Sequence, residues 1–244
     1  MIKLLCFLKR NKNLSREQFH DHWSNIHGGL FANNPDMRQY IARYEQNHRM
    51  EADYLRDPEE RPFEKQGYDG VTAIWYHSLD AFHAMNQDSY YREKVAADEK
   101  KLLEDNTANW LLCDNTDVIF DKPQGRESAT AKLMCMVRKN TALEHKQFHK
   151  HWLEHHGGLF INEPDLNKDI LVYDQNHRSE ADYEMGPERN QDGVTEQWFE
   201  SIERFHQSLE EPIQKTHVEP DVAYMLDPRG THFIMTHLPE VIIG

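Results

Sequence analysis

The sequence contains one long stretch twice, as FHDHWSNIHGGLFANNPDMRQYIARYEQNHRMEADY at residues 19–54 and as FHKHWLEHHGGLFINEPDLNKDILVYDQNHRSEADY at residues 148–183. The offset is constant at 129 residues (148 − 19), and 22 of the 36 positions are identical. This agreement is far beyond chance, and the copy is longer than the short repeats that build solenoids. The chain is therefore a tandem duplication.

The duplication extends beyond these stretches. After a six-residue deletion the offset becomes 123, so that DGVT at 69–72 matches DGVT at 192–195. Between the copies, KPQGRESAT at 122–130 combines proline, glycine and serine, which favour turns and loops. We therefore expect two domains, residues 1–121 and 130–244.

Each copy has the pattern of six secondary-structure elements. Ser15 precedes an amphipathic run that contains Phe19 and Trp23, which predicts a capped helix, and Gly28-Gly29 is expected to end it. A second, longer helix is expected over residues 79–103, and short apolar runs predict strands at 2–8, 37–48, 69–77 and 110–120. The second copy repeats this βαββαβ order from about residue 131 to 237.

This order suits a four-stranded antiparallel sheet with both helices on one face. The other face would remain bare and apolar, and a chain with two copies can cover it by packing sheet against sheet. The fold class expected is α+β, with two fused ferredoxin-like βαββαβ units that form a pseudo-dimeric α/β barrel. A gap in the barrel interior would be a ligand pocket.

Composition narrows the classes of partner. The 28 basic and 42 acidic side chains give a formal net charge of −14, which opposes binding to phosphate backbones. No apolar run approaches the ~18 residues of a membrane span, and the N-terminal MIKLLCFLKRNK does not have the pattern of a secretion signal. Three cysteines are too few for a disulfide scaffold. We therefore expect a cytoplasmic protein with neither nucleic-acid nor membrane partners.

The helix end Trp23-Ser24-Asn25-Ile26-His27 and the YEQNH strand that follows it resemble the EthD family. The resemblance covers both copies and implies a dimeric α/β barrel of ferredoxin-like topology. The sequence departs from the family pattern at His27-Gly28-Gly29-Leu30, where a small residue and proline are more usual after the histidine. The family implies function less sharply, because its barrel hosts cyclases, dehydratases, decarboxylases, lyases, monooxygenases and haem enzymes.

Candidate chemistry centres on histidines. His27 and its counterpart His156 stand where a cationic imidazole can cap its own helix, or where it can act as an acid or base at the barrel mouth. His48 closes a strand in which alternation places it on the same face as Tyr44 and Gln46, either as a pocket wall or as a solvated edge. Tyr44 could donate a hydrogen bond to a developing oxyanion.

Asp53 follows His48 closely and could orient its imidazole as a general base. The alternative is that Asp53 forms only a structural salt bridge with Arg49. The flanking loops 50–68 and 179–191 could act as lids. The candidate catalytic residues are His27, His48, Asp53, His156, His177 and Asp182, and the candidate substrate-binding residues are Tyr44, Tyr54, Trp75, Tyr173, Tyr183 and Trp198.

We expect neither a metal nor a cofactor. Many imidazole nitrogens are available, from His20, His22 and His27 in the first copy and from His149, His151, His155 and His156 in the second. His20 and His22, however, are two residues apart on a helix and do not face one another, and the H-E-x-x-H and C-x-x-C spacings are absent. The tryptophans Trp75 and Trp198 are more typical of a core than of a ligand platform.

These residues lead to three functional hypotheses. The first is a cofactor-independent acid–base enzyme, of the lyase, dehydratase, decarboxylase or cyclase type, that acts on a small hydrophobic aromatic or polyketide-like molecule. The alternatives are an oxygen-using monooxygenase or haem-associated oxidoreductase, and a non-catalytic binding protein for a hydrophobic metabolite. The protein would be a monomer with an internal pseudo-dimer or a homodimer.

The two halves differ near the predicted pocket, so we expect one half to keep the working site. The positions that change from the first copy to the second are Ile26 to His155, Ala73 to Glu196, Ile74 to Gln197 and His77 to Glu200.

Overall fold

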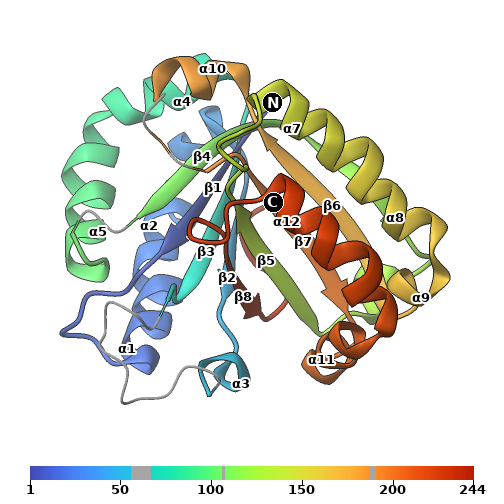
Figure 1. Cartoon of the computed structure of the whole chain (residues 1–244). Coiled ribbons are helices and arrows are strands. Elements are labelled where there is room, and N and C mark those ends of the chain that lie inside the picture. Colours follow the sequence, from blue (N-terminus) through green and yellow to red (C-terminus); the bar gives the residue numbers. More distant parts are fainter. Residues whose placement is uncertain (56–66, 106–107, 187–188, 190) are drawn as a thin grey trace. The chain divides into compact units, whose positions relative to one another are not determined.

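The computed structural model describes residues 1–55, 67–105, 108–186, 189 and 191–244. The chain divides into two compact units (Figure 1). The first unit contains Met1–Leu112 and Pro239–Gly244, and the second contains Cys113–Leu238. Each unit is an antiparallel sheet with helices, as the α+β prediction requires.

The sheet of the first unit has the order β4-β1-β3-β2-β9. Cys6 on β1 lies opposite Thr72 on β3, and Gln46 on β2 lies opposite the same residue from the other side. Its strands are β1 (Ile2–Leu8), β2 (Ile41–His48), β3 (Gly70–Tyr76), the beginning of β4 (Asn109–Asp121) and β9 (Glu240–Ile243). Its helices are α1 (Arg16–Asp21), η1 (His22–His27), α2 (Gly28–Ala32), η2 (Pro35–Gln39), α3 (Glu51–Tyr54), α4 (Leu79–Gln87), η4 (Tyr91–Val95) and α5 (Ala96–Leu102).

The sheet of the second unit has the matching order β8-β5-β7-β6-β4, and Figure 1 shows α7, α8 and α12 alongside its strands. Its strands are β5 (Ala131–Val137), β6 (Ile170–Arg178), β7 (Gly193–Phe199), β8 (His232–Thr236) and the remainder of β4. Its helices are α6 (Gly125–Ser128), α7 (His145–His151), η5 (Trp152–His156), α8 (Gly157–Asn162), α9 (Pro164–Asn167), α10 (Glu180–Met185), α11 (Ile202–Glu210), η6 (Gln214–Val218) and α12 (Glu219–Met225).

The units differ from the predicted domains 1–121 and 130–244 at their ends. The later part of β4 pairs with β6, where Phe120 lies opposite Tyr173. In the first unit, β9 pairs with β2, where Ile243 lies opposite Tyr44. Each unit therefore gains its fifth strand from the C-terminal part of the other repeat. Two ferredoxin-like units are confirmed, and closure of their sheets into a barrel stays a prediction.

The first helix does not end at Gly28-Gly29. Ser15 and Gln18 form the expected capping box, but the helix continues through a π-helical turn, η1, into α2 and ends at Asn33. Gly28 is instead a packing position, because a Cβ there would lie 3.0 Å from the Ile242 side chain. His27 is consequently inside the helix, and capping of a helix terminus does not account for it.

The expected helix over residues 79–103 is interrupted at Asp88. The backbone of Asp88 is extended, and its carboxylate accepts a hydrogen bond of 3.0 Å from the amide of Tyr91. This contact caps the segment that follows, η4 and α5, because it satisfies an amide at the new helix start. The segment after the break contains Asp98, which contacts His22 and His27 of the first helix.

The sheet face away from the cavities carries buried apolar side chains, as predicted, such as Leu5, Phe7, Met134 and Met136, but buried charged groups, which the sequence did not predict, lie among them. On this face of the second unit, Lys132 and Glu196 are buried and their charged groups are 2.5 Å apart. Lys132 also lies 4.5 Å from the centre of the Trp198 ring. In the first unit, Lys3 is buried at 4.7 Å from the Trp75 ring. Ion pairing and contact with aromatic faces offset the desolvation of these charges.

Candidate active site

Each unit has a partly open apolar cavity between its helices and one face of its sheet. The first cavity, of about 270 Å³, is lined from the sheet by Tyr44, Thr72 and Tyr76 and from the helices by His27 and Glu99. The sequence predicted a pocket against the strands, in the barrel interior. The structure places both cavities within the units, under the helices.

His27 reaches this cavity with its imidazole held by a carboxylate. Its Nδ1 lies 3.1 Å from Oδ2 of Asp98, and Nε2 of His22 lies 2.9 Å from the other oxygen. The hydrogen bond from His27 lowers the pKa of Asp98, burial opposes this and the bond from His22 adds to it, so that the pKa lies below its ordinary value. Asp98 is therefore a carboxylate that accepts Nδ1–H, and among the described residues Nε2 of His27 has no hydrogen-bond partner.

Glu99 places a carboxyl group in the same cavity. Burial raises its pKa, although attraction to His27 and a hydrogen bond of 3.3 Å from the Tyr91 hydroxyl act against the shift. Neighbouring Asp98 also raises the pKa. The first cavity thus contains a carboxyl group that holds its proton more strongly than usual, near a carboxylate-bound imidazole.

Tyr44, Gln46 and His48 share one face of β2, as the alternation predicts. The amide nitrogen of Gln46 donates to the Tyr44 hydroxyl at 2.9 Å, and Nε2 of His48 lies 3.2 Å from the Gln46 amide oxygen. Tyr44 lines the cavity, and burial raises its pKa. His48 does not line it, because the Trp23 ring lies against His48 with centroids 4.5 Å apart.

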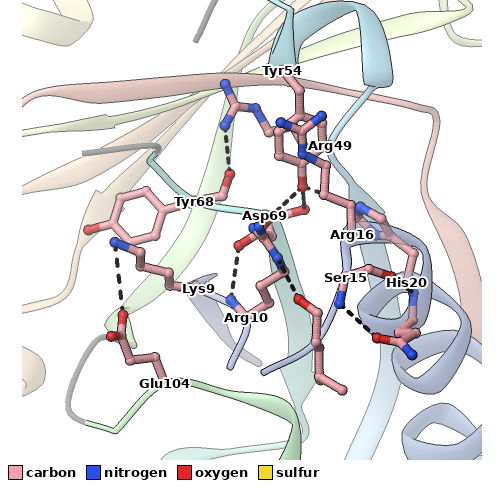
Figure 2. A network of polar contacts seen from close by, with 12 residues as sticks. Lys9, Arg10, Ser15, Arg16, His20, Arg49, Tyr54, Tyr68, Asp69 and Glu104 are labelled. Carbon is pink, nitrogen blue, oxygen red and sulfur yellow. Dashed lines mark hydrogen bonds and ion pairs between the residues drawn. The ribbon is translucent and has the colours of Figure 1, made fainter. Parts of the chain in front are cut away.

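His48 belongs instead to a polar network centred on Asp69, part of which Figure 2 shows. Nδ1 of His48 lies 2.9 Å from Nδ1 of His20, and the other ring nitrogen of His20 is 3.3 Å from the Tyr54 hydroxyl. Tyr54 donates a 2.7 Å hydrogen bond to Asp69, which also pairs with Arg10 at 2.7 Å. A continuous chain of hydrogen bonds therefore links Asp69 to the cavity tyrosine, Tyr44.

The expected pairing of His48 with Asp53 is not found. Asp53 accepts a 2.7 Å hydrogen bond from Nε of Arg49, and both side chains are buried. Asp182 pairs in the same way with Arg178 at 2.5 Å. These ion pairs fix the short helices α3 and α10 to the ends of β2 and β6. The loops 50–68 and 179–191 were expected to act as lids. Parts of them, residues 56–66, 187–188 and 190, lie outside the described residues.

The predicted aromatic residues divide between the cavities and other places. Tyr44 and Tyr173 line the cavities, whereas Trp75 and Trp198 lie on the opposite face of their sheets. Tyr183 resembles Tyr54 in donating a 2.7 Å hydrogen bond to an aspartate, here Asp192.

The second cavity, of about 330 Å³, contains His156, the counterpart of His27, but has no counterpart of Glu99. Nδ1 of His156 lies 2.7 Å from Asp221 Oδ2, and Nε2 of His151 lies 2.6 Å from Oδ1. The positions of Tyr91 and Glu99 are taken by Gln214 and Val222.

The paired histidines also differ in the second unit. Nε2 of His149 contacts the Asp192 carbonyl oxygen at 3.0 Å. Nδ1 of His177 is buried and has no hydrogen-bond partner within the part of the chain that the structure describes. Burial, reinforced by His149, lowers the pKa of His177 to about 3.

Sequence reasoning missed Asp98, Asp221 and Glu99. The repeat itself contained a signal, because Asp98 matches Asp221 at the offset of 123 while the adjacent Glu99 and Val222 differ. An acid shared by both copies next to an acid in only one copy indicates a common structural pair beside a specialised group.

Fold and site together define a duplicated ferredoxin-like α+β protein with one histidine-bearing cavity per unit. The EthD domain model matches residues 11–106 and 140–229, and the chain belongs to this family. No curated protein matches the sequence.

Solved structures share the fold at low sequence identity. An anthrone oxidase-like protein aligns over 98% of this chain and 91% of its own, with 6% identity and a TM-score of 0.64. Chlorite dismutase from Candidatus Nitrospira defluvii, in complex with imidazole, aligns over 96% and 90%, with 11% identity and a TM-score of 0.51. At these identities the likeness concerns the fold alone. In the described part of the chain, no helix has the length and hydrophobicity needed to cross a membrane.

Proposed function

We propose that the first cavity is the active site of an acid–base enzyme that acts on a small hydrophobic aromatic or polyketide-like molecule. The observation that carries this proposal is the presence of Glu99 and the His27–Asp98 pair in one apolar enclosure. An acid with a raised pKa beside an oriented imidazole is the arrangement that proton transfer near neutral pH requires.

The two groups take different parts of the transfer. Asp98 holds the Nδ1–H tautomer of His27, so the lone pair of Nε2 is the base, and the same carboxylate stabilises the imidazolium that forms. Glu99 keeps its proton to a higher pH than an ordinary glutamate and serves as the acid. Elimination, dehydration, decarboxylation and aldol-type cyclisation all need this combination.

The size and lining of the cavity indicate the substrate. A volume of about 270 Å³ is nearly twice the ~150 Å³ of an apolar cavity that holds benzene, so it suits a molecule of one or two rings. Leu4, Ile74 and Phe82 offer apolar walls, and the Tyr44 hydroxyl offers a polar contact to an oxygen atom of the substrate.

The test is proton exchange on a panel of mono- and bicyclic phenols and cyclic 1,3-diketones in D₂O, followed by NMR. Binding is first measured by the fluorescence of the cavity residues Trp23 and Trp110. We expect the full chain to accelerate exchange or turnover of at least one compound, and E99Q and H27N to lower the rate at least tenfold. H156N in the second cavity is the matched control and retains the rate.

Two results would contradict the proposal. One is a panel in which no compound binds, and the other is an unchanged rate in E99Q. Equal losses of rate in H27N and H156N would reject the assignment of the active site to the first unit.

An oxygen-using oxidoreductase is the second candidate, because a base in an apolar cavity also converts a phenol to the electron-rich anion that reacts with oxygen. The His27–Asp98 pair is the observation that favours it. Loss of turnover under anaerobic conditions would decide for this reaction, and a Soret band in the purified protein would identify a haem enzyme.

A further inference from the structure

The second unit brings together two neighbouring histidines of one helix and an aspartate 70 residues after the first of them, a set that is absent from the first unit. His151 and His155 are four residues apart on one helix, and Asp221 comes from α12. One ligand atom from each lies within 4.8 Å of the other two. Nε2 of His151 is 2.6 Å from Asp221 Oδ1, and Nε2 of His155 is 3.6 Å from the same oxygen.

We propose that His151, His155 and Asp221 form a binding site for a divalent transition-metal ion of the Zn²⁺ class. Metal–ligand bonds of about 2.0–2.1 Å at tetrahedral angles place neighbouring donor atoms about 3.3 Å apart. The two distances to Asp221 Oδ1 bracket this value, and the ligand atoms of the two histidines lie within 4.8 Å of each other. Rotation of the exposed His155 side chain can bring the three donors to this spacing.

The donor set determines the type of ion. Two imidazole nitrogens and one carboxylate oxygen suit Zn²⁺, Co²⁺ and Ni²⁺, whereas Mg²⁺ and Ca²⁺ prefer oxygen ligands throughout. Three protein ligands leave a fourth position for water or another small ligand. The net charge of −14 favours approach of any cation.

The surroundings give the site both access and support. The His155 side chain is 58% exposed, so an ion can reach it from solvent, while Asp221 is buried at 6%. The second oxygen of Asp221 contacts Nδ1 of His156 at 2.7 Å, which fixes the carboxylate as outer contacts of metal ligands commonly do. An ion here would share Asp221 with the histidine of the second cavity.

The first unit provides a natural control. His22 and Asp98 match His151 and Asp221, but Ile26 stands where the second unit has His155. The first unit therefore lacks one ligand, and the absence of the site from this unit follows from a single residue.

The experiment is titration calorimetry of the tag-free, chelator-treated full chain with Zn²⁺, together with Co²⁺ absorption spectroscopy. We expect one equivalent to bind to the wild-type protein, H155I to bind at least tenfold more weakly, and I26H to gain a second equivalent. Co²⁺ should give the visible bands of a four- or five-coordinate ion, and Mg²⁺ should give no heat.

The proposal would be overturned if the wild-type protein failed to bind Zn²⁺ at micromolar concentration. It would also be overturned if H155I bound as well as wild type, since the binding would then come from other surface histidines. Position 155 is exposed, and circular dichroism of H155I checks that its fold is intact. Neither result depends on activity in the first cavity.

Discussion

Tyr91 donates a hydrogen bond of 3.3 Å to Oε1 of Glu99, and both side chains line the first cavity. The second unit has Gln214 and Val222 at these positions, so the same fold forms without the acid. The pair is thus not needed for the architecture. Retention of an acid in an apolar place, at a cost to stability, is typical of an active site.

Replacement of Glu99 by the valine of the other repeat should stabilise the protein while it abolishes activity. Because the folded-state pKa of Glu99 is raised, the carboxyl group destabilises the fold increasingly as pH rises through that pKa. We expect E99V to gain about 1 kcal/mol in urea unfolding at pH 8 and less at pH 5. Y91F, which keeps the Glu99 carboxyl group, is the control. A loss of stability in E99V at pH 8 would count against this account.

His177, whose Nδ1 is buried, should make the protein sensitive to acid. Its folded-state pKa of about 3 lies below the ordinary value of 6.5, so the unfolded chain binds a proton that the folded chain does not. The stability is therefore complete above about pH 6.5 and is lost as pH falls toward 3, with a slope of up to about 1.4 kcal/mol per pH unit. We expect H177Q to reduce this slope in urea titrations between pH 7 and 4. The exposed His237, changed to Gln, should leave it unchanged.

The buried pair of Lys132 and Glu196 should show strong coupling. K132M removes the buried ammonium that lies 2.5 Å from the Glu196 carboxylate, so we expect it to lower the unfolding free energy by about 3–5 kcal/mol. The double variant K132M/E196A, which restores the alanine that the first repeat has at position 73, should recover most of the loss. Additive losses in a double-mutant cycle would show that the two groups act independently.

Gly70 should tolerate no side chain. A Cβ at this position would overlap the Trp23 ring, and we expect G70A to cost about 1–3 kcal/mol through overpacking. Gly158 is the matched control, because its Cβ would meet nothing nearer than 3.9 Å. G158A in helix α8 should therefore be neutral or stabilising by up to about 1 kcal/mol. Equal effects of the two alanines in chemical denaturation would argue against close packing at Trp23.

The fold was largely predictable because the sequence contains it twice. The 2–8 strand and the Ser15 cap follow from local patterns, and the second copy supplies an independent reading of each element. The exchange of β9 was not predictable in the same way. The first repeat ends in one long strand, β4, and the second ends in two short strands, β8 and β9, and a strand pattern in the sequence does not tell which sheet the strand joins.

The site was less predictable, because its pairs depend on long-range packing. Asp98 lies 71 residues from His27 in the chain, whereas Asp53 lies only five residues from His48. Proximity in sequence favoured the second pairing, but Arg49 is four residues from Asp53 and takes its carboxylate. Gly28-Gly29 was read as a helix end because glycine commonly serves there, whereas the structure uses Gly28 for close packing.

The pairing of β9 with β2 bears on the order in which the molecule can be built. Residues 240–243 leave the ribosome after all the other described strands of both sheets. The edge of β2 that pairs with β9 therefore has no strand partner while the second repeat is synthesised. The first half of the chain therefore completes its structure last, and until then the open edge of β2 can pair with a strand of another chain.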